Sequence, residues 1–267
     1  MKKTIISCVL FLTAVTAFSQ TPMKTAAEAK LSASDLAVKI ADRILATTTY
    51  EFKNTKTGKT YKSVKNLPLD MNVKVACKYN NWHYTNGVTH IALMELADKT
   101  GAKKYDDYVL KNMNFVFNEG NLDFFKKQYE QAMKNEGWYG VRKLSWHMIF
   151  RGKRLDDNGP MGASLIDLQM KHPNNSFLNY INETAEHLNY GEPRLADGTI
   201  ARIWPHENTI WADDAFMAIS FLARMAKMTG DMSYINDAAN QVIKYHKYLW
   251  CPEKRILYHC YHTDTDE

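Results

Sequence analysis

Apolar residues recur along most of this chain at the spacing of an amphipathic helix. In residues 35–46, Leu36, Ile40 and Ile44 stand at i, i+4 and i+8, which places them on one helix face. The same periodicity predicts further helices over residues 82–98, 103–117, 122–134, 158–170, 176–188, 215–227 and 234–249. The pattern is typical of a mainly helical protein.

Three segments depart from the helical period. Residues 193–204 contain Asp197-Gly198, a pair typical of two-residue hairpin turns, followed by threonine and isoleucine, which favour strands. Residues 47–69 are polar and predict a loop. Residues 137–154 are rich in aromatic side chains and fit neither the helical nor the strand period. We therefore expect one small hairpin among the helices.

Two of the predicted helix pairs begin with related phrases. Trp82 opens the run W-H-Y-T-N-G and Trp211 opens W-A-D-D-A-F, and matching landmarks follow at a constant offset of 129 positions (211−82, 230−101, 234−105). A weaker third copy lies 75 positions after the first (157−82) and has Asp157 in place of the tryptophan. Fixed self-similarity is typical of stacked supersecondary units, and the unit here is a pair of helices.

Helix pairs repeated around a ring place one helix of each pair inside. The first helix of each copy is the more apolar, so we expect it to be the inner one. All inner helices then begin at the same end, where the side chains of Asp157, Trp211, Asp213 and Tyr84 would converge. Helix N-termini carry partial positive charge and free N–H groups, which favour a bound carboxylate.

The acids at these helix starts are the leading catalytic candidates. Asp213 could act as a general acid or base, with Trp211 offering a face for a sugar ring, but it is equally well suited to capping its helix. Asp157 could be the second acid that glycoside chemistry requires, or again a cap. One of two neighbouring carboxylates can raise the pKa of the other until it donates a proton near neutral pH. Asp214 is expected to be a cap or a supporting partner.

Several other side chains were weighed as ligands. Arg202 and His206 precede the acidic phrase and could hold an anion or lie on the surface. We expect no metal and no cofactor, because the possible ligands near the end of the sequence have no recognised spacing; they are His259, Cys260, His262 and Asp264. The three cysteines after residue 19 predict core thiols with one bridge at most, and they are Cys77, Cys251 and Cys260.

The first nineteen residues are typical of a secretory signal. Lys2 and Lys3 form a basic start, residues 5–15 are apolar, and Ala17-Phe18-Ser19 fits a cleavage site. We expect a signal peptide over 1–19, a leader over 20–32, a single domain over 33–267, and a secreted protein of the bacterial periplasm. The formal charge of +5 includes both lysines, and no basic run indicates nucleic acid. No later segment predicts a membrane span, and nothing indicates an oligomeric state.

Four phrases together resemble a known family. They are W-H-Y-T-N-G-V at 82–88, L-D-D-N-G-P-M-G at 155–162, R-I-W-P-H-E-N-T-I-W-A-D-D-A-F-M at 202–217 and L-Y-H-C-Y at 257–261. They are similar to the unsaturated uronyl hydrolases of glycoside hydrolase families 88 and 105. The resemblance extends from about residue 33 to the end of the sequence.

The resemblance implies an all-α fold, an (α/α)6 toroid of six helical hairpins. It implies a substrate with a 4,5-unsaturated uronic acid at the non-reducing end, as polysaccharide lyases leave, and hydration of the vinyl ether instead of displacement at the anomeric carbon. By motif position Asp213 would donate the proton and Asp157 would position water and substrate. The residues implied in substrate binding are Trp211, Tyr84, His259, Arg202 and His206.

Two departures from the family pattern leave other readings open. Cys260 replaces the usual glycine, and the sequence ends before the expected W-(A/G)-R-x-N-G-W segment, so we expect a toroid that is incomplete at its C-terminus. A non-catalytic or inactive carbohydrate-binding toroid is one alternative. An inverting glycosidase or a polysaccharide lyase on a similar toroid is another.

Overall fold

The computed structural model describes residues 32–152 and 154–265. The chain divides into two compact units, residues 1–43 and 44–267. Helix α2 runs over Ala33–Thr47, close to the predicted bounds. The expected signal peptide and nearly all of the leader lie outside the described residues. No described helix has the length and apolar character needed to span a membrane.

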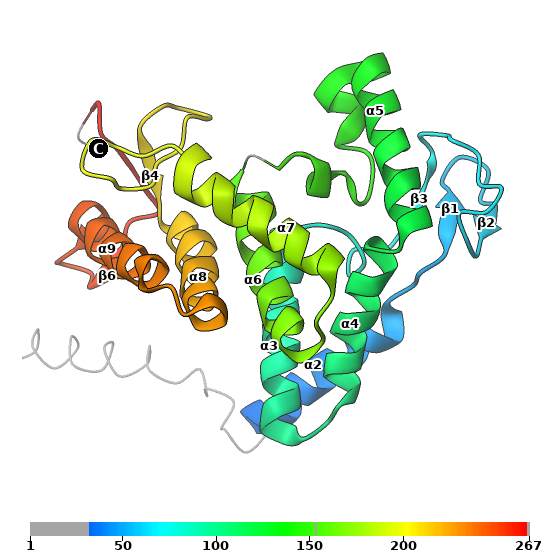
Figure 1. The fold of residues 1–267 in the computed structure, drawn as a ribbon, viewed down its shortest axis with the longest axis horizontal. Coiled ribbons are helices and arrows are strands. Elements are labelled where there is room, and N and C mark those ends of the chain that lie inside the picture. Colours follow the sequence, from blue (N-terminus) through cyan, green and yellow to red (C-terminus); the bar gives the residue numbers. More distant parts are fainter. Residues whose placement is uncertain (1–31, 153, 266–267) are drawn as a thin grey trace, which may run out of the picture. The chain divides into compact units, whose positions relative to one another are not determined.

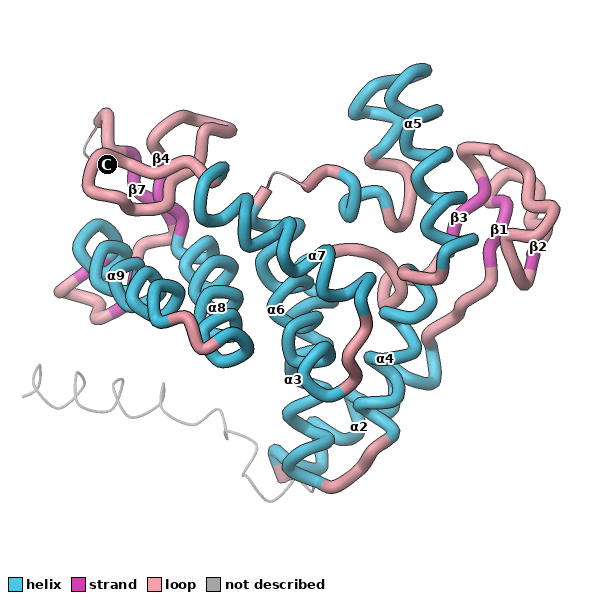
Figure 2. The backbone as a smooth tube through the Cα atoms, viewed as in Figure 1, coloured by secondary structure: helices cyan, strands magenta, loops and turns pink. Residues whose placement is uncertain are grey.

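Residues 44–267 are built mainly from antiparallel helix pairs, as Figures 1 and 2 show. The helices are α3 (Tyr84–Thr100), α4 (Lys104–Val116), α5 (Glu119–Val141), α6 (Leu155–Lys171), α7 (Asn175–Glu186), α8 (Ala212–Thr229) and α9 (Met232–Leu249). Most of their ends lie within about three residues of the predicted bounds, and the all-α prediction is confirmed. The closure of six such pairs into a ring stays a prediction.

The first helix of each pair forms an inner layer. Helix α6 packs along both α3 and α8, and these two contacts are among the most extensive in the fold. Helices α4, α7 and α9 pack mainly on their own partners, α3, α6 and α8. The inner position expected for the first helix of each copy is therefore observed.

Glycines allow the inner helices to approach closely. A Cβ atom on Gly87 of α3 would lie 2.3 Å from the carbonyl carbon of Pro160 in α6. A Cβ on Gly159 of α6 would lie 2.4 Å from the carbonyl oxygen of Met217 in α8. Both distances are far below van der Waals contact, so only glycine fits at these crossings.

The repeated Thr-Gly pair ends an inner helix in both copies. Gly101 after α3 and Gly230 after α8 adopt the left-handed conformation, with φ of 70° and 75°. The N–H of Gly101 donates to Ala97 O, and that of Gly230 donates to Ala226 O, so each glycine satisfies an orphan carbonyl of its helix. The landmark that defined the repeat is therefore a helix C-cap.

The strands are short, and most were not predicted. An antiparallel sheet of order β2-β1-β3 joins β1 (Phe52–Asn54), β2 (Thr60–Tyr61) and β3 (Val73–Val75), so the prediction of a loop over 47–69 was wrong there. Phe52 is fully buried and packs against aromatic side chains from α4 and α5, namely Phe115, Phe124 and Phe125. Packing on those helices stabilises a strand that is too short to show periodicity.

Two further segments are now assigned. The hairpin expected over 193–204 has the predicted turn, with Gly198 at φ +83° and its N–H bonded to Leu195 O, but a single bridge between Arg194 and Ile200 replaces a ladder. In 137–154, α5 continues past a non-helical Gly137 to Val141, and a 3₁₀ turn follows over His147–Phe150.

The end of the described chain adds two small antiparallel pairs. Strand β5 (Trp250–Cys251) pairs with β6 (Ile256–Leu257), and β4 (Thr209–Trp211) pairs with β7 (Cys260–His262). The second pair fixes the residues that precede α8.

Candidate functional site

The N-termini of α6 and α8 bring two acidic doublets together. Asp156 lies in the first turn of α6, and Asp213 and Asp214 lie in the first turn of α8. Carboxylate oxygens of these three residues lie within 4.8 Å of one another. The close packing of the two helices therefore concentrates negative charge at one point, where the helix dipoles partly offset it.

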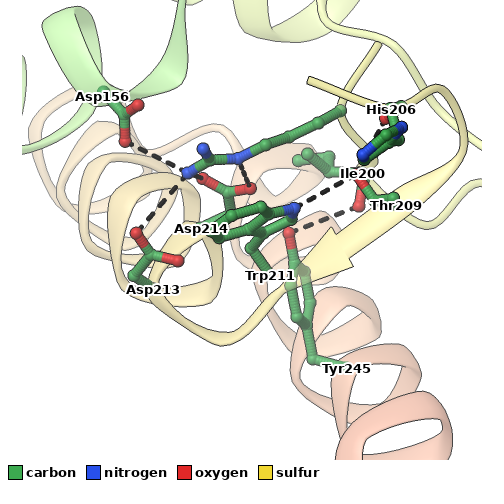
Figure 3. Close-up of polar contacts among 9 residues, drawn as sticks. Asp156, Ile200, His206, Thr209, Trp211, Asp213, Asp214 and Tyr245 are labelled. Atoms are coloured by element: carbon green, nitrogen blue, oxygen red, sulfur yellow. Dashed lines mark hydrogen bonds and ion pairs between the residues drawn. The ribbon is translucent and has the colours of Figure 1, made fainter. Parts of the chain in front are cut away.

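Arg202 connects the three carboxylates, as Figure 3 shows. Its Nε donates to Asp214 Oδ2 at 2.6 Å and its Nη2 donates to Asp214 Oδ1 at 2.7 Å, a bidentate pair. The same Nη2 lies 3.3 Å from Asp156 Oδ1 and 3.5 Å from Asp213 Oδ2. We call these four residues the Arg202 cluster.

Burial separates the acids of the cluster. The side chain of Asp214 is 3% exposed and that of Asp213 is 46% exposed. Burial raises the pKa of Asp214 to about 6, although Arg202 opposes the change. Burial acts on Arg202 in the opposite sense, but Asp214 keeps the pKa of the guanidinium above its ordinary value. Asp214 therefore supports the cluster from inside, and Asp213 is the member open to a ligand.

The three carboxylates could coordinate a cation, but the Arg202 guanidinium already lies against each of them. A metal ion would have to displace that charge. Among the described residues, the possible ligands near residue 260 form no such group, and Cys260 Sγ lies 4.0 Å from His262 Nε2. Cys77, Cys251 and Cys260 are free thiols.

Trp211 lies beside the cluster. The Arg202 guanidinium carbon is 4.5 Å from the centre of its ring, and Trp211 Nε1 donates to Thr209 Oγ1. The ring of His259 meets the Trp211 ring edge-on, with centroids 5.1 Å apart. Pairing of β4 with β7 creates this contact, since Ala212 N donates to His259 O. Two phrases far apart in the sequence thus form one wall.

His206 lies on the far side of this strand pair. Its carbonyl accepts from Thr209 Oγ1, and its ring is 5.5 Å from that of His262. These contacts attach His206 to the β4–β7 pair and not to the carboxylates.

Asp157 has a different environment from Asp156. Its side chain is 6% exposed and forms an ion pair with Arg151, and its carbonyl accepts from Trp82 Nε1. Burial raises the pKa of Asp157 to about 6 against the effect of Arg151. The structure therefore brings Asp156 to the Arg202 cluster and leaves Asp157 inside the α6 packing, so the catalytic role of Asp157 stays a prediction.

Tyr84 begins α3 and is 39% exposed. The preceding residue, His83, caps the helix and stacks on Tyr84 with ring centroids 4.5 Å apart. Burial lowers the pKa of His83 while the Asp156 charge opposes the change, which places the start of α3 within electrostatic reach of the cluster. The starts of the three inner helices thus approach one another, as predicted.

A cavity of about 360 Å³ adjoins the cluster. It shares Asp156, Arg202 and Asp214 with the cluster and is closed on other sides by the segments around α6, the end of α7 and the 193–204 turn. Its remaining lining residues are Arg154, Leu155, His187, Gly191, Glu192, Pro193, Ala201, Ile203 and Trp204.

Sequence reasoning gave no ligand role to Asp156, Arg154 or Trp204. The doublet of acids at 156–157 was visible, but successive residues of a helix point about 100° apart. Only the packing of α6 decides which member meets Arg202.

Comparisons with known proteins identify the relatives of this arrangement. The family model described as Glycosyl Hydrolase Family 88 matches residues 56–267. The fold is similar to that of a possible member of the GH105 family from Klebsiella pneumoniae, at 12% identity and a TM-score of 0.55, covering 89% of this chain and 54% of that one. A family 105 glycoside hydrolase from C. acetobutylicum gives 21% identity, a TM-score of 0.55 and coverage of 89% and 51%.

A possible GH105 member from Salmonella enterica gives 14% identity, a TM-score of 0.56 and coverage of 89% and 54%. This chain therefore spans about half the length of these structures. The comparison with curated proteins found no match. At these identities the solved structures show a shared fold.

Proposed function

The chain belongs to glycosyl hydrolase family 88, and on this premise we propose that it removes a 4,5-unsaturated uronic acid from the non-reducing end of oligosaccharides. Such ends are left when a polysaccharide lyase cleaves an acidic glycan. We further propose that the protein acts outside the cytoplasm, because residues 1–19 are typical of a secretory signal.

One observation carries the proposal. Asp213 is a half-exposed carboxylate at a helix N-terminus, next to an aromatic wall formed by Trp211 and His259. Arg202, which contacts both Asp213 and Trp211, fixes their relative position. A sugar ring against the tryptophan would lie beside a group able to transfer a proton.

The proposed reaction hydrates the double bond. Asp213 in its acid form donates a proton to C4 of the unsaturated ring, and positive charge develops at C5 and the ring oxygen. Water adds at C5 and returns a proton to a carboxylate. The hemiketal formed in this way opens and releases the remaining sugar, so one water molecule is consumed and no glycosyl–enzyme bond is needed.

The second carboxylate has two candidates. Asp157 is favoured by the family motif and by a pKa of about 6, which would let it exchange a proton near neutral pH. Asp156 is favoured by position, because it contacts Arg202 together with Asp213. Neither role depends on a metal or a cofactor.

The test is turnover of an unsaturated uronyl disaccharide, followed by loss of the ultraviolet absorbance of the double bond. We expect Asp213→Asn to lower kcat by about 10²–10⁴-fold, the usual contribution of general acid catalysis. Asp107→Asn is the matched control, since Asp107 is also exposed in the first turn of a helix but lies on α4.

Other outcomes identify the alternatives. Binding of the disaccharide without any turnover indicates a carbohydrate-binding toroid. A rise in absorbance on intact polysaccharide indicates a lyase, and release of saturated sugars with inversion indicates an inverting glycosidase. Full activity in Asp213→Asn refutes the assignment of this residue.

A further inference from the structure

The cavity beside the Arg202 cluster contains one arginine whose charge is not matched by a contact. Arg154 precedes α6 and is partly buried, and its guanidinium makes no ion pair or side-chain hydrogen bond with the described residues. Its one direct side-chain contact is with Trp204, whose ring centre lies 4.8 Å from the guanidinium carbon.

The other charged groups that line the cavity are paired. Arg202 is bound by three carboxylates, and His187 Nε2 lies 2.8 Å from Glu192 Oε2. Arg151, close behind the wall, pairs with Asp157. Arg154 is thus the lining residue with a free set of donors.

Electrostatics at Arg154 agree with this reading. Burial lowers the pKa of its guanidinium, and repulsion from Arg151 and Arg202 acts in the same direction. Attraction from Asp157 and Asp156 opposes these effects but does not cancel them. The site is therefore one where an added negative charge would be stabilised.

Stacking on Trp204 prepares the guanidinium for a ligand. A guanidinium that lies over an aromatic ring keeps the N–H donors at its edge free, and the ring restricts its rotation. Planar carboxylates accept two parallel hydrogen bonds from such an edge. The cavity volume of about 360 Å³ is in the range of pockets that bind small molecules.

We propose that this cavity is a subsite for the carboxylate of a hexuronic acid ring, with Arg154 as the residue that binds the acidic group. Asp156, His187 and Glu192 line the same cavity and offer polar partners for ring hydroxyls. The inference deepens the proposed function and rests on it for the source of the acidic sugar, but the anion selectivity can be measured without turnover.

The experiment compares binding of D-glucuronate and neutral D-glucose by NMR titration of the full chain. We expect the wild-type protein to bind glucuronate at least tenfold more tightly than glucose. Arg154→Met should lose about tenfold to a hundredfold of the glucuronate affinity and leave glucose binding unchanged, because a hydrogen bond to a charged group is removed.

Two further variants guard the interpretation. Arg154→Lys keeps the charge without the planar fork, so it should bind glucuronate with intermediate affinity. Arg142→Met removes the same charge from an exposed residue at the end of α5 and should leave the preference intact. Circular dichroism melts identify any variant that fails to fold, and in that case Arg154→Lys decides the question.

The inference is overturned if Arg154→Met keeps the wild-type preference for glucuronate, or if Arg142→Met reduces it equally. It is also overturned if the wild-type protein does not distinguish the two sugars. Absence of turnover with an Arg154-dependent preference would refute the proposed reaction alone. Turnover without that preference would refute the subsite alone.

Discussion

A methyl group at Gly159 should separate the two helices that carry the acids. Its Cβ would lie 2.4 Å from the Met217 carbonyl oxygen and 2.8 Å from the carbonyl carbon. Ordinary contact begins at about 3.4 Å, so Gly159→Ala requires α6 and α8 to move apart by roughly 1 Å. The atoms in the way belong to the backbone of α8 and cannot rotate aside.

The energetic cost follows from this displacement. Overpacking a dense interior costs about 1–3 kcal/mol, and a clash with backbone belongs at the upper end. Replacing glycine by alanine inside a helix returns about 0.5–1 kcal/mol. We therefore expect Gly159→Ala to lower the free energy of unfolding by about 2 kcal/mol, which corresponds to about 4–8 °C in Tm for a chain of this size.

The assay is urea unfolding followed by circular dichroism, with Gly120→Ala as the matched control. Gly120 lies in the first turn of α5, and a Cβ there would meet its nearest neighbour at 3.4 Å. The control should be neutral or more stable by at most about 1 kcal/mol. If Gly159→Ala is within about 0.5 kcal/mol of the wild type, the close crossing of α6 and α8 does not constrain the fold as argued.

The other predictions concern buried charge. Arg202→Met should cost about 3–5 kcal/mol near pH 8 because Asp214 is left buried without its partner; the deficit should shrink near pH 5, where Asp214 is protonated, and an equal deficit at both pH values in urea titrations would contradict this. Burial lowers the pKa of His90 to about 4 from 6.5, so the unfolded chain binds the proton first and stability falls as pH drops from 6.5 to 4, by roughly 3 kcal/mol; His90→Gln should flatten that slope. Asp157→Asn should lower Tm because it breaks a buried ion pair, whereas Asp156→Asn, at a side chain 30% exposed, should leave Tm unchanged and reduce turnover; a normal rate in Asp156→Asn with a lost rate in Asp157→Asn would assign the second acid to Asp157.

The helices could be predicted because their apolar residues repeat over many turns. The bounds of α4 and α9 differ from the prediction by two residues or fewer at each end. Strands β1 and β3 could not be predicted, since each is three residues long and is stabilised by side chains distant in sequence. Phe52 becomes a buried strand residue only because α4 and α5 present aromatic rings to it. Tertiary packing decides such segments, and no local pattern reports it.

The acidic site illustrates the same limit at the level of single residues. Both doublets place their second acid inside, with Asp157 5% and Asp214 2% exposed, and burial raises both pKa values to about 6. In each doublet that buried acid is held by an arginine, and the first acid is left more accessible, next to Arg202. The two helix starts therefore have the same internal arrangement 57 residues apart (213−156, 214−157), although the sequence repeat had aligned Asp157 with Trp211, 54 residues apart. Since a helix turns by about 100° per residue, a shift of three positions along the sequence is close to one turn and leaves the apolar pattern almost unchanged. Periodicity can therefore locate the acidic end of each inner helix, but the side chain that faces a ligand is selected by the contacts of α6 with α8 and by the arginine that each buried acid binds.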